Sequence, residues 1–253
     1  MRTLFVALAI FVATMILGPV VVVARLLGVP QGPNSIYARC VRRWARILNA
    51  AAGVKVRVHN AERLQNQHGA VVVANHVSWF DIFPLAAEVP WCSFVAKSEL
   101  RRIPLFGFAA ECVGIVFLDR ENRKQAFESY RVAANEVKRG RTIIVCPEGT
   151  RGHDYHLRPF KKGPFVLAIA SEAPIVPTIV YGAREVMPKG SFWIRPGIVD
   201  LHFLEPVPTK GYDYEHRADL MERVWSQMAD EMRSLYRVGT AEHAIAAEGT
   251  RAE

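Results

Sequence analysis

The hydrophobic pattern begins with an uncharged run at the N-terminus. After Arg2 no charged residue occurs until Arg25, so Thr3 to Ala24 is a 22-residue, mostly apolar segment. A helix of about 20 such residues is long enough to cross a bilayer core. A signal peptide and a buried core helix are the alternatives, but the run exceeds a usual h-region and no clear A-x-A site precedes Arg25. The run predicts a membrane helix that Gly18 and Pro19 should kink or break, so spanning the bilayer and dipping into one leaflet both stay open.

A second helix is predicted from Ser35 to Ala52, and it is amphipathic. Its basic face holds Arg39, Arg42, Arg43 and Arg46, and its apolar face holds Tyr37, Cys40, Val41, Trp44 and Leu48. Such a helix is typical of a protein lying on anionic lipid, with an ordinary surface helix packed on the domain as the alternative. The arginines that follow the first helix favour a cytoplasmic position for the rest of the chain.

From Val54 onward, apolar runs typical of strands alternate with helical patterns. The predicted strands are Val54–Val58, Ala70–Ala74, Ser93–Ala96, Ile115–Leu118, Thr142–Cys146, Ile175–Val180 and Val199–Leu204. The predicted helices between and after them are Arg123–Lys138, Lys161–Ser171 and Tyr214–Tyr236. This alternation predicts a single α/β domain with a mostly parallel or mixed sheet flanked by helices. We therefore expect membrane-anchoring helices in residues 1–52, the α/β domain in 53–237 and a disordered tail in 238–253.

Composition narrows the classes of partner. The chain has 253 residues, 51% of them hydrophobic, and a net charge of +8. An excess of positive charge favours an anionic partner, such as phosphate, nucleic acid or a lipid surface. Nucleic acid is disfavoured, because the arginines gather beside an apolar helix and no aromatic-basic binding module is present. The four cysteines form no CxxC pair and the histidines show no ligand spacing, which predicts reduced core thiols in the cytosol and argues against structural zinc.

The segment NHVSWFD, from Asn75 to Asp81, follows the predicted strand Ala70–Ala74. Catalytic groups are common where a strand of an open α/β sheet ends and a turn enters the next helix. A carboxylate five residues after a histidine can fold back across such a turn. Asp81 would then accept the Nδ1 proton of His76 and leave Nε2 free to take a proton. The alternative is that Asn75 and Asp81 serve only as turn and helix-cap residues.

Three further polar segments follow predicted strands. Lys97 comes just after one strand, GIVFLDR ends another at Arg120, and CPEGTRG follows Thr142–Cys146. In the last segment, Gly149 permits a positive φ, Thr150 offers a hydroxyl and Arg151 offers a planar fork for phosphate. Glu148 is expected to bond a substrate hydroxyl or to hold the arginine in position. Each segment alone has an ordinary explanation as a solvated strand end or a turn. Together they predict one cleft that holds a base and several cations, suited to the hydroxyl of a phosphorylated substrate.

Taken together, these segments resemble the sequence blocks of the glycerolipid acyltransferases. NHVSWFD is similar to their NHxxxxD block, GIVFLDR to the second block, PEGTR to the third, and VPTIV at residues 176–180 to the fourth. The order and spacing also fit, over roughly residues 50 to 210. The bacterial 1-acylglycerol-3-phosphate acyltransferases look most similar, including the two N-terminal helices and the FKKG segment at 160–163. Two positions depart from the pattern: Cys146 stands where an aromatic residue is usual, and Gly152 stands where a serine is usual.

The resemblance implies transfer of a fatty acyl group from acyl-CoA or acyl-carrier protein to the sn-2 hydroxyl of 1-acylglycerol-3-phosphate. It implies that His76 is the general base and that Asp81 orients it. Arg120 and Arg151, with Lys97 as a third candidate, would bind the phosphate, while Glu148, Gly149 and Thr150 would shape the acceptor site. It implies no metal or cofactor, and a bacterial inner-membrane location with the catalytic domain in the cytoplasm. The alternatives are another lysolipid acceptor, such as a lyso-ornithine lipid, and a non-catalytic lipid-binding protein.

Overall fold

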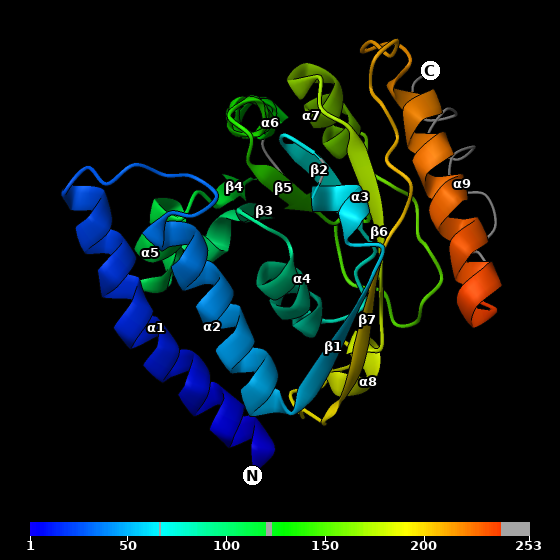
Figure 1. Cartoon of the computed structure of the whole chain (residues 1–253). Coiled ribbons are helices and arrows are strands. Elements are labelled where there is room, and N and C mark those ends of the chain that lie inside the picture. The colour runs from blue at the N-terminus through cyan, green and yellow to red at the C-terminus, as the bar shows by residue number, and fades with distance from the viewer. Residues whose placement is uncertain (66, 120–122, 239–253) are drawn as a thin grey trace.

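Within the part of the chain that the structure describes, seven strands join into one mixed sheet in the order β1-β7-β6-β2-β5-β3-β4. This computed structural model describes residues 1–65, 67–119 and 123–238 (Figure 1). The strands are β1 Val54–His59, β2 Ala70–Ala74, β3 Cys92–Lys97, β4 Val116–Leu118, β5 Thr142–Val145, β6 Ile175–Tyr181 and β7 Gly197–Phe203. Neighbouring strands run parallel except for β6 and β7, which are antiparallel. The predicted fold class is therefore confirmed, and each predicted strand boundary lies within two residues of the observed one.

The central strand β2 shows why the apolar runs form strands. Its side chains alternate between the two faces of the sheet, and every residue of Ala70–Ala74 is buried. Val71 and Val73 join a core with α6, α7 and α9, whereas Val72 joins a core with α4 and α8 on the other face. A strand covered on both faces needs an uninterrupted apolar sequence rather than an alternating one. This arrangement leaves the ends of the strands as the places for polar residues.

Helices cover both faces of the sheet (Figure 1). They are α1 Arg2–Leu26, α2 Ile36–Ala52, α3 Glu62–Gln65, α4 Ile82–Glu88, α5 Phe106–Cys112, α6 Arg123–Lys138, α7 Gly163–Ser171, α8 Ala183–Val186 and α9 Arg217–Tyr236, with short 3₁₀ helices η1 Trp79–Asp81 and η2 Ser98–Arg102. The longer α6, α7 and α9 confirm the predicted helices. The shorter α3, α4, α5 and α8 were not predicted, because one or two turns are too short for a 3.6-residue pattern to emerge.

The N-terminal helix α1 is continuous from Arg2 to Leu26, with Pro19 inside it. The expected break at Gly18 and Pro19 is therefore wrong. α1 lies against α5, where Gly18 packs beside Leu105 and Ala109. By length and composition, α1 is the described helix long and apolar enough to cross a membrane. Many of its large apolar side chains are exposed along one side.

The apolar face of α2 packs inside the protein, which corrects its interpretation as a lipid-contacting face. Tyr37 and Leu48 are buried, and the Trp44 indole donates a hydrogen bond of 3.0 Å to Thr14 Oγ1 of α1. Trp44 also meets Phe83 of α4 edge-on, with 5.5 Å between ring centroids. Buried packing of this face fits the alternative of a helix docked on the domain. The basic face still points outward, and Arg39, Arg43 and Arg46 are exposed.

Cys40, Cys92 and Cys112 are buried thiols outside any disulfide, as the sequence predicts. The predicted disordered tail falls on residues 239–253, which lie outside the described residues.

Candidate active site

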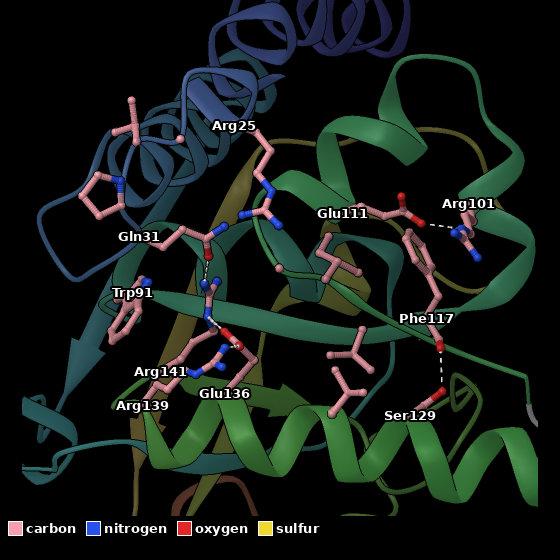
Figure 2. Close-up of a pocket in the computed structure, with 17 residues that line it drawn as sticks. Arg25, Gln31, Trp91, Arg101, Glu111, Phe117, Ser129, Glu136, Arg139 and Arg141 are labelled. Atoms are coloured by element: carbon pink, nitrogen blue, oxygen red, sulfur yellow. Dashed lines mark hydrogen bonds and ion pairs between the residues drawn. The ribbon is translucent and has the colours of Figure 1, made fainter. Parts of the chain in front are cut away.

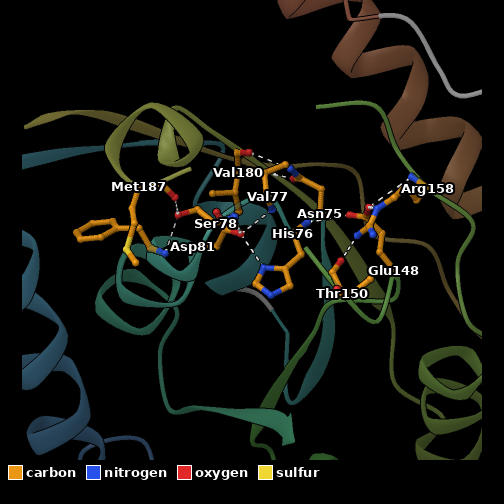
Figure 3. Close-up of polar contacts among 11 residues, drawn as sticks. Asn75, His76, Val77, Ser78, Asp81, Glu148, Thr150, Arg158, Val180 and Met187 are labelled. Carbon is orange, nitrogen blue, oxygen red and sulfur yellow. Dashed lines mark hydrogen bonds and ion pairs between the residues drawn. The ribbon is translucent and has the colours of Figure 1, made fainter. Parts of the chain in front are cut away.

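The His76 imidazole lies at the end of β2, where the apolar run gives way to Asn75. The Asn75 side chain bridges to β6 by donating 3.0 Å to the Val180 carbonyl and accepting 2.7 Å from the Val180 N–H. This bridge fixes the point at which the chain leaves the sheet. His76 Nδ1 then bonds Asp81 Oδ2 at 2.7 Å, and Figure 3 shows Nε2 pointing away from Asp81. Nε2 has no hydrogen-bond partner among the described residues, and 19% of the His76 side chain is exposed.

Asp81 is fully buried and is held by the turn that it closes. Its Oδ2 atom accepts hydrogen bonds of 2.9 Å from the N–H groups of Val77 and Ser78, besides the bond from His76. Ser78 completes the turn, because its hydroxyl accepts from Phe80 N–H and donates to the Met187 carbonyl. The carboxylate is therefore both a capping group and the partner of His76. Asp81 therefore combines both alternatives predicted from the sequence: it caps the turn and it bonds His76.

Glu148 connects the turn after β5 with the turn after β2. Its Oε1 atom accepts a hydrogen bond of 2.8 Å from the backbone N–H of His76. A second link joins the same turns, since the Gly152 N–H donates 2.7 Å to the His76 carbonyl. A Cβ at Gly152 would lie 2.9 Å from the Asp154 carbonyl oxygen, so the turn there has little room for a side chain. Gly149 adopts the expected positive φ, at +73°.

Arg158 completes this network, and the sequence reasoning missed it. Its Nε atom donates 2.9 Å to Glu148 Oε2, and its guanidinium also donates to the Thr150 carbonyl. Glu148 thus holds an arginine, but that arginine is Arg158 rather than Arg151. Burial raises the pKa of Glu148, and the hydrogen bonds from His76 and Arg158 oppose that rise. The signal that would have found Arg158 is weak, because it lies in an irregular segment beyond PEGTR.

Arg151 lies near the histidine turn. Its guanidinium stands over the Trp79 ring, 5.5 Å from the centroid, a distance typical of a cation–π contact. Burial lowers the pKa of Arg151, and the charge of Asp81 opposes that effect. Figure 3 shows Thr150 beside Glu148 and Arg158, and the Thr150 residue is exposed.

The other predicted cations lie at the same edge of the sheet or outside the described residues. Lys97 ends β3, is 58% exposed in its side chain and pairs with Glu99 at 2.9 Å. The ends of β2, β5 and β3 are adjacent, so Lys97 shares an edge with His76 and Glu148. Arg120 lies outside the described residues.

An apolar cavity of about 560 Å³ lies beside the site. It is lined mainly by α1, α2, α4, α5, β3 and β4, and nearly all of the lining side chains are aliphatic or aromatic. Trp79, which carries Arg151 on its ring, forms part of the wall. The site therefore joins a hydrogen-bonded histidine–aspartate pair and a cation to a space suited to a hydrocarbon chain.

One described group has the composition of a metal site: His59, Asp200 and His202, with ligand atoms within 4.8 Å of one another. Arg57 occupies both Asp200 oxygens, at 2.7 and 2.6 Å. The two imidazole rings are stacked, 4.1 Å apart and 4° from parallel. A metal ion binds in the plane of each ring nitrogen, so one ion cannot serve both rings in this arrangement. The group is an ion-pair network between β1 and β7.

Comparison with known proteins places these features in a family. The family model described as Acyltransferase matches residues 55–181. A 1-acyl-sn-glycerol-3-phosphate acyltransferase of Saccharomyces cerevisiae is 32% identical over 219 residues, which is 85% of this chain and 71% of the yeast protein. The 1-acyl-sn-glycerol-3-phosphate acyltransferase alpha of Homo sapiens is 31% identical over 207 residues, covering 81% of this chain and 73% of the human protein.

A solved structure is similar over almost the whole chain. It is the crystal structure of the 1-acyl-sn-glycerophosphate (LPA) acyltransferase PlsC from Thermotoga maritima, with a TM-score of 0.76 and 27% sequence identity. The similarity covers 95% of this chain and 100% of that chain. Because the covered part includes nearly every residue, the two N-terminal helices belong to the shared architecture as well as the sheet.

Proposed function

This chain belongs to the Acyltransferase family, and on that premise we propose that it acylates the sn-2 hydroxyl of 1-acylglycerol-3-phosphate. The product is phosphatidic acid. The names of the yeast, human and Thermotoga maritima relatives support this acceptor. The observation that carries the proposal is the hydrogen bond of 2.7 Å between His76 Nδ1 and Asp81 Oδ2, with Nε2 directed away from the carboxylate.

In the proposed reaction, Nε2 of His76 takes the proton of the acceptor hydroxyl as its oxygen attacks the thioester carbonyl. Asp81 holds the proton on Nδ1 and stabilises the imidazolium that forms. The tetrahedral intermediate then collapses by breaking its carbon–sulfur bond, and the imidazolium returns its proton to the leaving thiolate. The products are an ester and a free thiol. The nucleophile is the hydroxyl of the substrate, so the scheme calls for no enzyme nucleophile, metal or bound cofactor.

The acceptor and donor occupy different parts of the site in this proposal. Arg151, with Lys97 at the same sheet edge, binds the acceptor phosphate, and Arg120, which lies outside the described residues, stays a predicted phosphate ligand. Gly149 and Thr150 border the glycerol group. Glu148 acts indirectly, because its two oxygens are engaged by His76 N–H and Arg158. The apolar cavity beside Trp79 receives an acyl chain. Acyl-CoA and acyl-carrier protein both remain candidate donors.

We further propose that α1 lies along one leaflet, with the catalytic domain on the cytoplasmic side. A 25-residue helix is about 37 Å long. Near its start, Arg2 donates 2.9 Å to the Ala52 carbonyl and Thr3 Oγ1 accepts 3.0 Å from Ile194 N–H. Just beyond its end, Gln31 donates 2.9 Å to the Cys112 carbonyl. A helix tied to the domain at both ends supports an in-plane anchor better than a crossing.

The test is an acyl-transfer assay on the full-length protein in detergent micelles. Acyl-CoA and acyl-carrier protein serve as donors, and lysophosphatidate and a monoacylglycerol without phosphate serve as acceptors. We expect transfer to lysophosphatidate and its loss in His76→Ala. His216→Ala is the matched control, because His216 Nδ1 pairs with Asp213 at 2.8 Å on the surface, far along the chain from the site. Transfer only to the monoacylglycerol would show that the acceptor carries no phosphate. No transfer from either donor would favour a lipid-binding protein.

A further inference from the structure

A second cavity, of about 910 Å³, begins at the amino-terminal edge of the strands, opposite the edge that carries His76, and extends along β4 to Arg101 (Figure 2). Its lining includes Trp91, Gly114 and Arg141, which come just before β3, β4 and β5. Parallel strands carry their amino ends to one edge and their carboxyl ends to the other, and Cys146 marks the far end of β5. Five residues of extended chain separate Arg141 from Cys146, or about 17 Å. This end of the cavity is therefore distinct from the site around His76.

Arginine dominates the charge of this cavity, which we call the arginine cavity. Among the described lining residues, Arg25, Arg101, Arg139 and Arg141 face Glu111 and Glu136. Four guanidinium groups against two carboxylates leave a formal excess of two positive charges. Glu136 is shared, since it accepts 2.6 Å from Arg139 and 3.0 Å from Arg141, while Glu111 pairs with Arg101. The Arg25 side chain has no hydrogen bond or ion pair with another described residue. The described lining therefore carries more positive than negative side chains and suits an anionic ligand.

Arg141 is fixed as the floor of the cavity. It is 1% exposed, donates 2.6 Å to the Val113 carbonyl and also donates to the Gln31 side chain. Its guanidinium stands 5.2 Å from the centroid of the Trp91 ring. Burial lowers the pKa of Arg141, opposed by Glu136, so an added anion would favour the charged form. A buried and oriented cation of this kind is prepared for a ligand before it arrives.

The surroundings of the arginine cavity indicate where the anion comes from. Arg25 extends from the last turn of α1 toward Gln31 and Arg141 (Figure 2). The next two residues, Leu26 and Leu27, are each 75% exposed. A cation beside exposed leucines at the end of an apolar helix is typical of the boundary between acyl chains and headgroups. A soluble ligand would gain nothing from these leucines, whereas a phospholipid would contact them with its chains.

We propose that the arginine cavity binds the phosphate group of an anionic phospholipid. Arg25 and Arg139 contact the phosphate at the rim, the buried Arg141 adds positive charge beneath it, and the acyl chains lie along Leu26 and Leu27. The bound lipid ties the end of α1 to α6 and to the start of β5. The phosphate position at Arg25 and Arg139 is separate from His76, because Arg139 and Arg141 precede β5 whereas His76 follows β2; Ile115 and Phe117 line both this cavity and the apolar cavity.

The test measures binding of the full-length protein to phosphatidylcholine vesicles with and without phosphatidylglycerol. Phosphatidylglycerol is neither substrate nor product of the proposed reaction, so binding at the catalytic site does not obscure the result. The variant is Arg25→Gln with Arg139→Gln. The control is Arg39→Gln with Arg43→Gln, which removes two exposed charges from the neighbouring α2. We expect the affinity gained from phosphatidylglycerol to fall about tenfold or more in the variant and to persist in the control.

Two results would overturn the proposal. An equal loss in the variant and the control would assign the effect to general surface charge. Thermal stabilisation of the micellar protein by inorganic phosphate or adenosine 3′,5′-bisphosphate, lost in the variant, would assign the cavity to a soluble phosphate. An unchanged circular dichroism spectrum and unchanged acyl transfer in pure phosphatidylcholine vesicles exclude misfolding of the variant, since neither arginine belongs to the catalytic machinery.

Discussion

The carboxylate of Glu148 accepts a hydrogen bond of 2.8 Å from the backbone N–H of His76. This bond joins the PEGTR turn to the histidine turn, although 72 residues separate them in the chain. The same carboxylate binds Arg158, so the buried charge is balanced by an arginine that is itself partly buried. A general base needs a fixed backbone as well as a fixed ring. In the proposed mechanism, Glu148 holds the backbone of His76 and Asp81 holds its ring.

Replacement of Glu148 should therefore lower turnover without removing any group that touches the substrate. In Glu148→Ala, the His76 N–H loses its acceptor and Arg158 loses its counterion, and we expect kcat to fall about 10- to 100-fold. Glu148→Gln keeps an oxygen for the N–H and should lose less. Steady-state kinetics at saturating substrate measures both variants, with thermal unfolding as the check on folding. Equal kcat in Glu148→Ala and the parent would exclude this positioning role.

Asp81→Asn tests the orientation of the base. The amide oxygen can keep the hydrogen bonds that converge on Oδ2, but without a negative charge the side chain cannot stabilise an imidazolium as a carboxylate does. We expect kcat to fall about 10²- to 10⁴-fold. Asp213→Asn is the control, because Asp213 forms the same type of pair with His216 on the surface. A similar small effect in both variants would contradict the role of Asp81.

Arg151→Ala should raise the KM for lysophosphatidate while leaving the KM for the acyl donor almost unchanged. Loss of a charge-assisted hydrogen bond to phosphate predicts a rise of about 10- to 100-fold. Arg151→Lys should restore part of the affinity, because it keeps the charge but not the planar fork. The exposed Arg131 of α6 provides the control substitution, Arg131→Ala. An unchanged KM in Arg151→Ala would remove Arg151 from the phosphate site.

The features that depend on residues close together in the chain could be predicted from the sequence. Those that depend on contacts between distant segments could not. The strands were predictable because both faces of β2 must be apolar, and His76 with Asp81 was predictable because five residues span one turn. The role of Arg158 was not predictable, because no sequence pattern around it indicates an ion pair with Glu148. The interpretation of α2 failed for a related reason: a tryptophan contacting lipid and a tryptophan packed on Thr14 and Phe83 give the same pattern. Only the fold reveals which surface covers an apolar face.

The exposed face of α1 should carry membrane binding. Leu8, Val12, Ile16 and Val23 are 43 to 61% exposed and do not line the apolar cavity. Their replacement by serine should weaken partitioning into vesicles, with the fold retained, because each loses apolar contact with lipid. Vesicle flotation measures the effect. Val6→Ser is the contrast, since buried Val6 belongs to the core and its replacement should lower stability instead. Undiminished flotation of the serine variant would exclude this face as the anchor.

The ion pair between Arg57 of β1 and Asp200 of β7 should make the stability of the fold depend on pH. Asp200 is 5% exposed and accepts two bonds from Arg57 and one of 2.9 Å from His59. Burial acts to raise the pKa of Asp200, but these hydrogen bonds outweigh it and hold the pKa below its ordinary value of 3.8. A lowered folded-state pKa means that the ionised group stabilises the fold above the ordinary pKa. That stabilisation disappears as the pH falls through the folded-state pKa.

Asp200→Asn should therefore be less stable than the parent near neutral pH, by about 1 kcal/mol, because Arg57 is half exposed and solvent weakens the pair. The difference should shrink as the pH falls below about 4. Urea unfolding of the full chain in detergent, compared at neutral pH and at about pH 3, measures it. Asp230→Asn removes the exposed partner of Arg233 and should change stability little at either pH. A difference between Asp200→Asn and the parent that stays constant with pH would show that the amide disturbs packing and that the ion pair adds no stability.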